Sequence, residues 1–249
     1  MERIIEPRVA VIGGVNMDIG GSPFAKLVMR DSNPGIITAR PGGVGRNIAH
    51  DLRLLGVNVS LVTAVGGDVY GQGILDSCRE LGIDMSLARI LPERRSSTYL
   101  YVTDETGDMQ IGIADMEITE CITPEYLALR MDEINAFDAV VLDANLSAES
   151  VEYAARHCTA PIIADPVSTA KAMRLVPVLD KLWAIKPNIY EAEKLTGEHD
   201  PEKAAAALLE QTRTLELVQG AFVGPWGYME PVDRERISRL SLVEPMKQY

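Results

Sequence analysis

Short apolar runs alternate with segments of helical period along most of this chain of 249 residues. Residues 9–12 are continuously apolar and end at two glycines, as expected for a strand that is buried on both faces. Residues 46–55 then carry apolar side chains at helical spacing, and a glycine follows as the helix stop. Residues 57–65 are predicted to form the next strand and residues 71–81 the next helix. This order predicts a mostly parallel sheet.

The same alternation returns in the second half of the chain. Residues 139–142 and 161–164 are short apolar runs, and Asp143 and Asp165 follow them at once. A further strand is expected at residues 183–185. The pattern predicts a three-layer α/β/α fold of Rossmann-like type, with helices on both faces of the sheet. Ligands of such sheets bind outside the carboxyl ends of the strands, where polar residues gather in this sequence.

Two stretches, residues 19–41 and 95–113, interrupt the alternation because they lack a helical period. Residues 97–102 and 109–113 look extended, and they flank the turn-rich segment at residues 104–108. This arrangement is typical of a β-hairpin. The two stretches together predict a small β-sheet lid that projects from the main sheet.

The composition excludes two classes of partner. The formal net charge is −12 at neutral pH, which disfavours binding to nucleic acid or to an anionic membrane surface. No apolar run approaches the roughly 20 residues of a membrane-spanning helix, and no signal peptide is recognised. The three cysteines, Cys78, Cys121 and Cys158, are odd in number and widely spaced, so neither disulfides nor a zinc site is indicated. We therefore expect a cytoplasmic protein.

Two glycine-rich segments carry polar residues that could meet a ligand. Residues 13–18 read Gly-Gly-Val-Asn-Met-Asp after the first strand, and residues 41–47 read Pro-Gly-Gly-Val-Gly-Arg-Asn before the first helix. The first is not a dinucleotide fingerprint, and the second lacks the Lys-Ser/Thr ending of a P-loop. Taken alone, the first is explained by an ordinary turn with a capping aspartate, and the second equally well by a structural loop.

Together, the two segments resemble the ribokinase-like (PfkB) carbohydrate kinase family. Residues 65–71 are similar to the next turn of that family, and residues 186–193 to its Asn-x-x-Glu motif. The resemblance covers about residues 7–210. It implies a ribokinase-like kinase domain over residues 1–211, with the lid formed from about residues 19–41 and 95–113.

Some local strings resemble the pseudouridine kinases within that family. They are residues 41–47, 113–116, 143–146 and 165–171. The resemblance implies ATP-dependent phosphorylation of a ribose-containing nucleoside or sugar, with pseudouridine converted to pseudouridine 5′-phosphate. Two alternatives stay open: a kinase for another sugar or nucleoside, and a non-catalytic protein that keeps only the nucleoside pocket.

The resemblance also implies residues for a sugar site above the strand ends. The residues expected to hold the sugar hydroxyl groups are Asn16, Asp18, Gly42, Gly43, Asn47 and Asn145. A carboxylate accepts hydrogen bonds from two hydroxyl groups, and glycine N–H groups complete the ring of contacts. The lid residues expected to cover the base are Thr98, Tyr99 and Ile113.

On the phosphate side, Asn188 and Glu191 match the family motif that organises ATP and Mg²⁺. Glu191 is the expected metal-site carboxylate, because Mg²⁺ prefers hard oxygen ligands and keeps several waters. Lys171 is a candidate for neutralising phosphate charge, although a solvated lysine on a helix is an equally good interpretation.

The catalytic base of the family has no counterpart in this sequence. The family supplies it from a Gly-x-Gly-Asp segment at a helix N-terminus, and no such string follows residue 188. Residues 212–249 are an atypical tail with no clear period, for which a frameshift, a premature end and genuine divergence are all open explanations. We expect impaired turnover. The resemblance further implies a homodimer formed through the lid.

Overall fold

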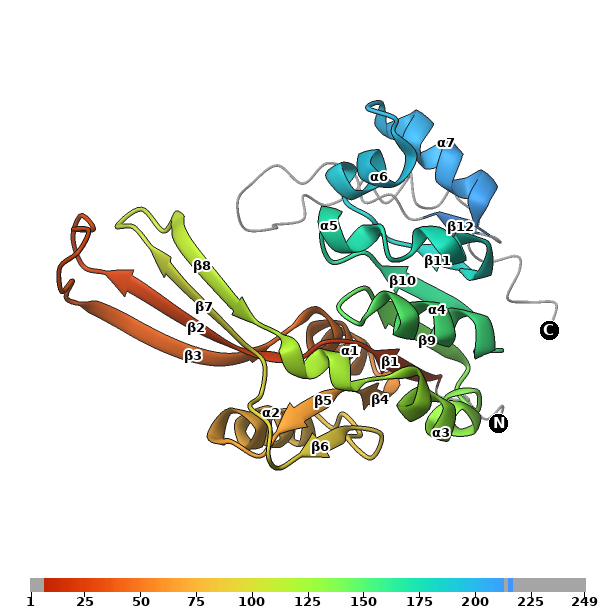
Figure 1. Ribbon diagram of the computed structural model, residues 1–249, viewed down its shortest axis with the longest axis horizontal. Helices are drawn as coiled ribbons and strands as arrows, with labels where there is room; N and C mark the ends of the chain where they lie inside the picture. The colour runs from red at the N-terminus through yellow and green to blue at the C-terminus, as the bar shows by residue number, and fades with distance from the viewer. Residues whose placement is uncertain (1–6, 213–214, 217–249) are drawn as a thin grey trace.

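A six-stranded parallel sheet forms the centre of the molecule, in the order β12-β11-β10-β9-β1-β4 (Figure 1). The computed structural model describes residues 7–212 and 215–216. The strands are β1 (Arg8–Ile12), β4 (Asn58–Val62), β9 (Ala139–Asp143), β10 (Ile162–Asp165), β11 (Ala184–Ile185) and β12 (Leu215–Glu216). The continuous apolar runs of the sequence are thus the strands of a sheet covered on both faces.

Helices cover the two faces of this sheet, and the strand side chains divide between two cores. Along β1, Ala10 and Ile12 join one core, while Val11 points into the other. The Val11 core includes helices α1 (Val44–Leu54) and α2 (Val69–Glu80). The Ile12 core includes α3 (Pro124–Ile134), α4 (Ala148–His157), α6 (Ile189–Thr196) and α7 (Pro201–Gln211). The predicted three-layer α/β/α fold is confirmed.

One predicted strand is wrong in its extent. Residues 57–65 form two strands rather than one, because the chain leaves the main sheet at Thr63. Its second part is β5 (Ala64–Gly66), which pairs in parallel with β6 (Arg89–Leu91) as a separate two-stranded sheet. The carbonyl oxygen of Thr63 accepts a hydrogen bond from Arg89 N at 2.7 Å. An apolar pattern alone does not show where a strand changes partners.

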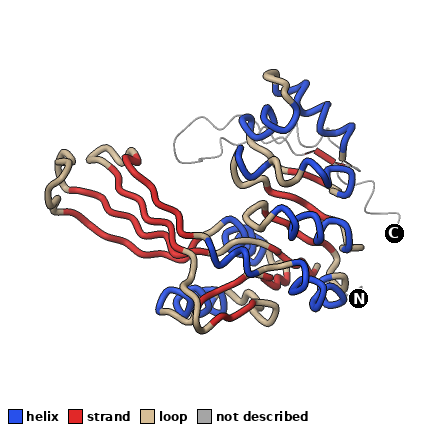
Figure 2. The backbone as a smooth tube through the Cα atoms, in the orientation of Figure 1, coloured by secondary structure: helices blue, strands red, loops and turns tan. Residues whose placement is uncertain are grey.

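The lid is a four-stranded sheet that stands away from the main body (Figures 1 and 2). Its order is β3-β2-β7-β8, built from β3 (Gly35–Gly42), β2 (Asn16–Pro23), β7 (Thr98–Thr103) and β8 (Met109–Asp115). β2 pairs antiparallel with β3 and parallel with β7, and β7 and β8 form the predicted hairpin. A small separate sheet is therefore present, and its first strand starts at Asn16 rather than near residue 19.

Short helices complete the described chain. They are η1 (Glu117–Cys121), α5 (Thr169–Ala172) and η2 (Val176–Lys181). The predicted tail falls outside the described residues, apart from Thr212 and β12. Within the described ranges, no helix is long and apolar enough to cross a bilayer.

Candidate functional site

The first predicted site residues lie where the lid joins the main sheet. β1 ends at Ile12, and two glycines and a valine lead directly into β2, which carries Asn16 and Asp18. Asn16 is only 5% exposed, and its Nδ2 donates a hydrogen bond of 2.5 Å to Asp18 Oδ1. Burial raises the pKa of the Asp18 carboxyl, while the Asn16 hydrogen bond and the charge of Arg46 act in the opposite direction. Asp18 is thus a partly buried carboxylate at the base of the lid.

Two glycines let the backbone close around this carboxylate. Gly42 lies opposite Asn16 in the β2–β3 register, and a Cβ at Gly42 would overlap the Asp18 carboxylate. Gly43 has a φ of 97°, and a Cβ there would lie 2.7 Å from both Gly14 O and Val15 Cα. Both positions require glycine, the second also because its backbone is left-handed. The structure therefore brings Asn16, Asp18, Gly42 and Gly43 together.

Asn47 lies one turn into α1, beside this group. Its N–H donates to Gly43 O at 2.9 Å, while its exposed side chain accepts from Arg46 Nη1 at 3.3 Å. Arg46 Nη2 also donates to Ser77 Oγ of α2 at 3.1 Å. Arg46 thus ties α1 to α2, and it places a positive charge near Asp18.

The lid face above Asp18 carries aromatic rings. In the β2–β7 register Asp18 is opposite Tyr99, and Gly20 is opposite Tyr101. A Cβ at Gly20 would overlap the Tyr101 ring, so the glycine makes room for it. The Tyr99 and Tyr101 rings lie 6.0 Å apart between centroids, at 30°. A carboxylate and two rings therefore share one face, and only Tyr99 of this pair was predicted.

Two other predicted lid residues lie on the opposite face. Thr98 pairs with Met17, and Ile113 pairs with Leu100. Because successive side chains of a strand point to opposite faces, both lie on the face opposite to Tyr99. Met17 is buried in the core beside α2. Thr98 and Ile113 therefore do not share a lid face with Asp18 and Tyr99, and their expected contact with a base stays a prediction.

Asn145 reaches the same region from the end of β9. A Cβ at Gly14 would lie 3.0 Å from both Asn145 Cβ and Nδ2, so the two segments pack closely. Asn145 Nδ2 donates to Asp143 Oδ2 at 3.1 Å, and its Oδ1 accepts from Lys171 Nζ at 2.6 Å. Burial lowers the pKa of Lys171, Arg174 lowers it further, and Asp143 raises it. Lys171 is held in place, which decides against a freely solvated lysine.

Asn188 and Glu191 form a capping box at the start of α6. Asn188 Oδ1 accepts from Glu191 N at 2.9 Å, and Glu191 Oε2 accepts from Asn188 N at 2.8 Å. Glu191 is 4% exposed. Burial raises its pKa, the Asn188 N–H lowers it, Asp165 raises it and Lys186 lowers it. These side chains organise the N-terminal end of α6.

The described residues fit Mg²⁺ in one limited way. Among them, no group of three or more His, Cys, Asp or Glu side chains is arranged to hold a metal ion. Mg²⁺ often keeps most of its waters and uses one or two carboxylates together with substrate phosphates. Glu191, whose pKa responds to the neighbouring Asp165, suits that water-mediated role rather than a protein cage.

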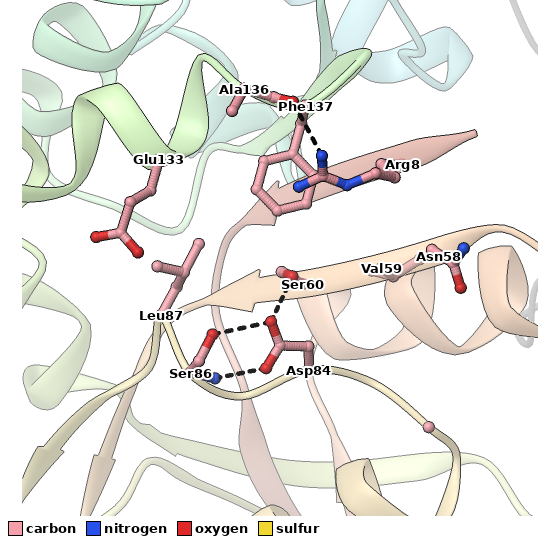
Figure 3. A pocket seen from close by; sticks show the side chains of 11 residues that line it. Arg8, Asn58, Val59, Ser60, Asp84, Ser86, Leu87, Glu133, Ala136 and Phe137 are labelled. Carbon is pink, nitrogen blue, oxygen red and sulfur yellow. Dashed lines mark hydrogen bonds between the residues drawn. The ribbon is translucent and has the colours of Figure 1, made fainter. Parts of the chain in front are cut away.

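A separate hollow of about 460 Å³ lies at the opposite, amino-terminal ends of β1 and β4 (Figure 3). The Arg8 guanidinium stands 4.8 Å from the Phe137 ring centre and donates to Ala136 O. Asp84 accepts from Ser60 Oγ and from the N and Oγ of Ser86, each within 2.9 Å. Because these charged groups are engaged with the protein itself, the hollow is a weaker candidate than the lid base.

The sequence matches the pfkB family of carbohydrate kinases over residues 6–219. The chain belongs to this family. The predicted family and the ribokinase-like fold are thereby confirmed. Membership of this family explains the motifs at residues 13–18, 41–47, 65–71 and 186–193 together.

Relatives of this pfkB chain include nucleoside kinases. The pseudouridine kinase of Escherichia coli K12 is 40% identical over 190 residues, which are 76% of this chain and 61% of that enzyme. The guanosine-inosine kinase of Exiguobacterium acetylicum is 33% identical over 145 residues, or 58% of this chain and 48% of that enzyme. A solved carbohydrate kinase from Agrobacterium tumefaciens has a TM-score of 0.75 at 30% identity, covering 82% of this chain and 67% of its own. The chain spans less than two thirds of the length of both curated relatives.

Proposed function

We propose that this chain provides the substrate side of an ATP-dependent nucleoside kinase, with pseudouridine as the acceptor and pseudouridine 5′-phosphate as the product. The observation that carries the proposal is the Asp18 carboxylate on the same lid face as Tyr99 and Tyr101. The similarity to a pseudouridine kinase at 40% identity supports the choice of nucleoside.

The chemistry of the lid base suits a ribonucleoside. A carboxylate that accepts from two neighbouring ribose hydroxyl groups gains charge-assisted hydrogen bonds, which are stronger than neutral ones. Asn16 holds one Asp18 oxygen, so the carboxylate is oriented before the ligand arrives. The rings of Tyr99 and Tyr101 offer apolar surface to a base. Gly42, Gly43 and Asn47 line the other side through the start of α1.

On the phosphate side, we assign Lys171, Asn188 and Glu191 to ATP and Glu191 to Mg²⁺. When bound, Mg²⁺ would neutralise charge on the phosphates of ATP. Lys171 is kept in one place by Asn145 and is available to attract an anionic group. Asn188 and Glu191 hold the start of α6 in a fixed geometry, which positions the backbone of residues 186–188.

The substrate assignment is tested by a thermal-shift panel of pseudouridine, uridine, adenosine, ribose and fructose 6-phosphate. A ligand at about 100 times its Kd stabilises a protein by about 2.7 kcal/mol, which shifts the melting temperature by several degrees. We expect the largest shift with pseudouridine. A larger shift with another member of the panel would move the assignment to that ligand, and no shift with any nucleoside would remove it.

A second candidate function is nucleoside binding without turnover. It is favoured by one observation, since no Gly-x-Gly-Asp string follows residue 188 in this sequence. Under this proposal, residues 1–211 form the kinase domain with its lid, and residues 212–249 do not supply a base. The panel reports binding under either function, and turnover is measured separately.

We also propose that two copies pair through the outer face of the lid. Four apolar side chains on that face are well exposed: Ile37, Leu100, Ile111 and Ile113. Ile37 is 80% exposed, and a contiguous apolar patch of this kind usually meets a partner. The opposite lid face is the one that carries Asp18, so pairing would leave the proposed substrate face open.

Light scattering after size exclusion tests this pairing. The wild-type chain is expected to elute as a dimer and Ile113→Asp as a monomer. Leu129→Asp, on the exposed side of α3, is the matched control and is expected to stay dimeric. A wild-type protein that is only monomeric would exclude the lid dimer.

The cysteines support a reducing compartment. Cys78, Cys121 and Cys158 are all free thiols, and burial raises the pKa of Cys78 and of Cys158. Buried thiols with raised pKa values are poor nucleophiles and serve as small apolar side chains. We include the cytoplasm in the proposal on this ground.

A further inference from the structure

Asp143 is a fully buried carboxylate that no proposed ligand contact uses. Its exposure is 0%, and it ends β9 at the carboxyl edge of the main sheet. It accepts three hydrogen bonds: from Gly14 N at 2.8 Å, from Asn145 N at 2.9 Å and from Asn145 Nδ2 at 3.1 Å. A buried carboxylate is costly unless its charge is well compensated, so these contacts call for an explanation.

Both glycine-rich segments pack directly on this carboxylate. A Cβ at Gly13 would overlap Asp143 Oδ2, and a Cβ at Gly45 would lie 3.1 Å from the same atom. Gly13 precedes the Asn16–Asp18 strand, and Gly45 lies in the first turn of α1. Glycine is therefore needed at two positions from different elements because Asp143 occupies the space between them.

The contacts continue from Asp143 toward the other side of the site. Asn145, oriented by Asp143, accepts from Lys171 Nζ at 2.6 Å. Arg174 Nη1 donates to Ala144 O at 2.9 Å and to Leu146 O at 2.6 Å, which fixes the loop on both sides of Asn145. One hydrogen-bonded chain thus runs from the Gly14 turn through Asp143 and Asn145 to Lys171.

We propose that Asp143 is a positioning residue that couples the nucleoside side of the site, at Gly14, to the phosphate side, at Lys171. This rests on the proposed function for the naming of the two sides. Asp143 touches no reacting atom itself. It holds the turn before Asn16 and, through Asn145, the ammonium group of Lys171. The geometry of both sides of the site therefore depends on this one carboxylate.

The charges around Asp143 agree with this role. Burial raises its pKa to about 6, the N–H groups of Asn145 and Gly14 lower it, and Asp165 raises it. Asp165 lies directly opposite in the β9–β10 register and pairs with Lys186 at 3.2 Å. Lys171 faces Asp143 as a cation, and Asp143 raises the pKa of Lys171 against burial and Arg174. Ionised Asp143 therefore favours the protonated form of Lys171.

The test compares Asp143→Asn with Asp165→Asn, which removes the same charge from the neighbouring strand end. The first readout uses no nucleoside: the rate at which Lys171 is acylated by acetic anhydride at pH 8, followed by peptide mass spectrometry. Loss of an opposite charge lowers a lysine pKa by about one unit, so we expect acylation about tenfold faster in Asp143→Asn. Asp165→Asn should leave the rate close to wild type.

The second readout is the Kd of pseudouridine between pH 5 and pH 7. In the wild type, protonation of Asp143 below about pH 6 should weaken binding by about tenfold at pH 5. Asp143→Asn should bind weakly throughout, without this transition. Asp165→Asn should retain the transition but move it to lower pH, because a repulsive charge has gone. Asp18 titrates in the wild type and in both variants. The difference between their curves of Kd against pH therefore reports the titration of Asp143.

Each outcome decides between the two ideas. If Lys171 reactivity and the pH transition are unchanged in Asp143→Asn, the positioning role is wrong, whatever the ligand. If Lys171 reactivity rises as expected but no protein binds a nucleoside, the positioning role stands and the proposed function fails. If Asp143→Asn does not fold, Asn145→Ala provides a second test. This variant keeps the Asp143 carboxylate but breaks the series of hydrogen bonds to Lys171, so Lys171 should again be acylated faster.

Discussion

The polypeptide of 249 residues is expected to phosphorylate pseudouridine at least about 10²-fold more slowly than a fusion that adds the C-terminal part of the Escherichia coli pseudouridine kinase. A positioned base contributes about 10²–10⁴-fold to such a reaction, and a donor to the developing charge about 10²–10³-fold. Both would come from the Gly-x-Gly-Asp segment that this sequence lacks after residue 188. Because one segment supplies both, the two factors cannot be multiplied.

An ADP-release assay with pseudouridine, ATP and Mg²⁺ measures this difference. The matched control is the same fusion with the aspartate of its added Gly-x-Gly-Asp segment changed to asparagine, which should return to the slow rate. Equal rates for the 249-residue polypeptide and the active fusion would show that residues of this chain already provide a base.

The second large effect is expected for Asp18→Ala. Each hydrogen bond to a charged group contributes about 1.5–3 kcal/mol, so loss of a carboxylate that holds two hydroxyl groups should weaken pseudouridine binding at least about 10²-fold. Unfolding should not be the cause. The pKa of Asp18 is raised by burial, so its ionised form costs stability as the pH rises above its usual range, and removal of the charge relieves that cost at pH 7.

Titration calorimetry at pH 7 checks this prediction, with Asp115→Ala as the control. Asp115 pairs with Thr98 in the β7–β8 register, so it lies at the lid base on the face opposite to Asp18. Its carboxylate contacts Arg95 at 3.2 Å. Asp115→Ala should bind pseudouridine as the wild type does. Equal loss in both variants would point to a general disturbance of the lid instead of a ribose contact.

The main sheet was predictable because β1, β9 and β10 are apolar runs that stop at a glycine or an aspartate, with segments of helical period between the strands. The lid was predictable because residues 19–41 and 95–113 interrupt the alternation of strands and helices. Its first boundary was not, since nothing in residues 13–18 distinguishes a turn with a capping aspartate from the start of a strand. The structure settles the matter by pairing Asn16 with Gly42.

Contacts between distant segments account for what the sequence did not predict. Asp143 was noted as a residue after a strand and as part of a string that resembles pseudouridine kinases, yet its partner Gly14 lies 129 positions earlier. The parity that puts Tyr99 with Asp18 and Ile113 on the other face follows from strand registers, which alternation within one strand cannot provide. The capping box of Asn188 and Glu191 was readable from spacing, but it was interpreted only as a ligand motif.

Hydrogen–deuterium exchange with and without pseudouridine tests the central claim, that the nucleoside binds between the lid and the carboxyl ends of the strands. Exchange is expected to be slower in peptides covering residues 14–20, 40–47 and 97–103. The hollow at the other end of the sheet, around Arg8, Ser60 and Asp84, should exchange as before (Figure 3). Protection at that hollow, with the lid peptides unchanged, would contradict the account.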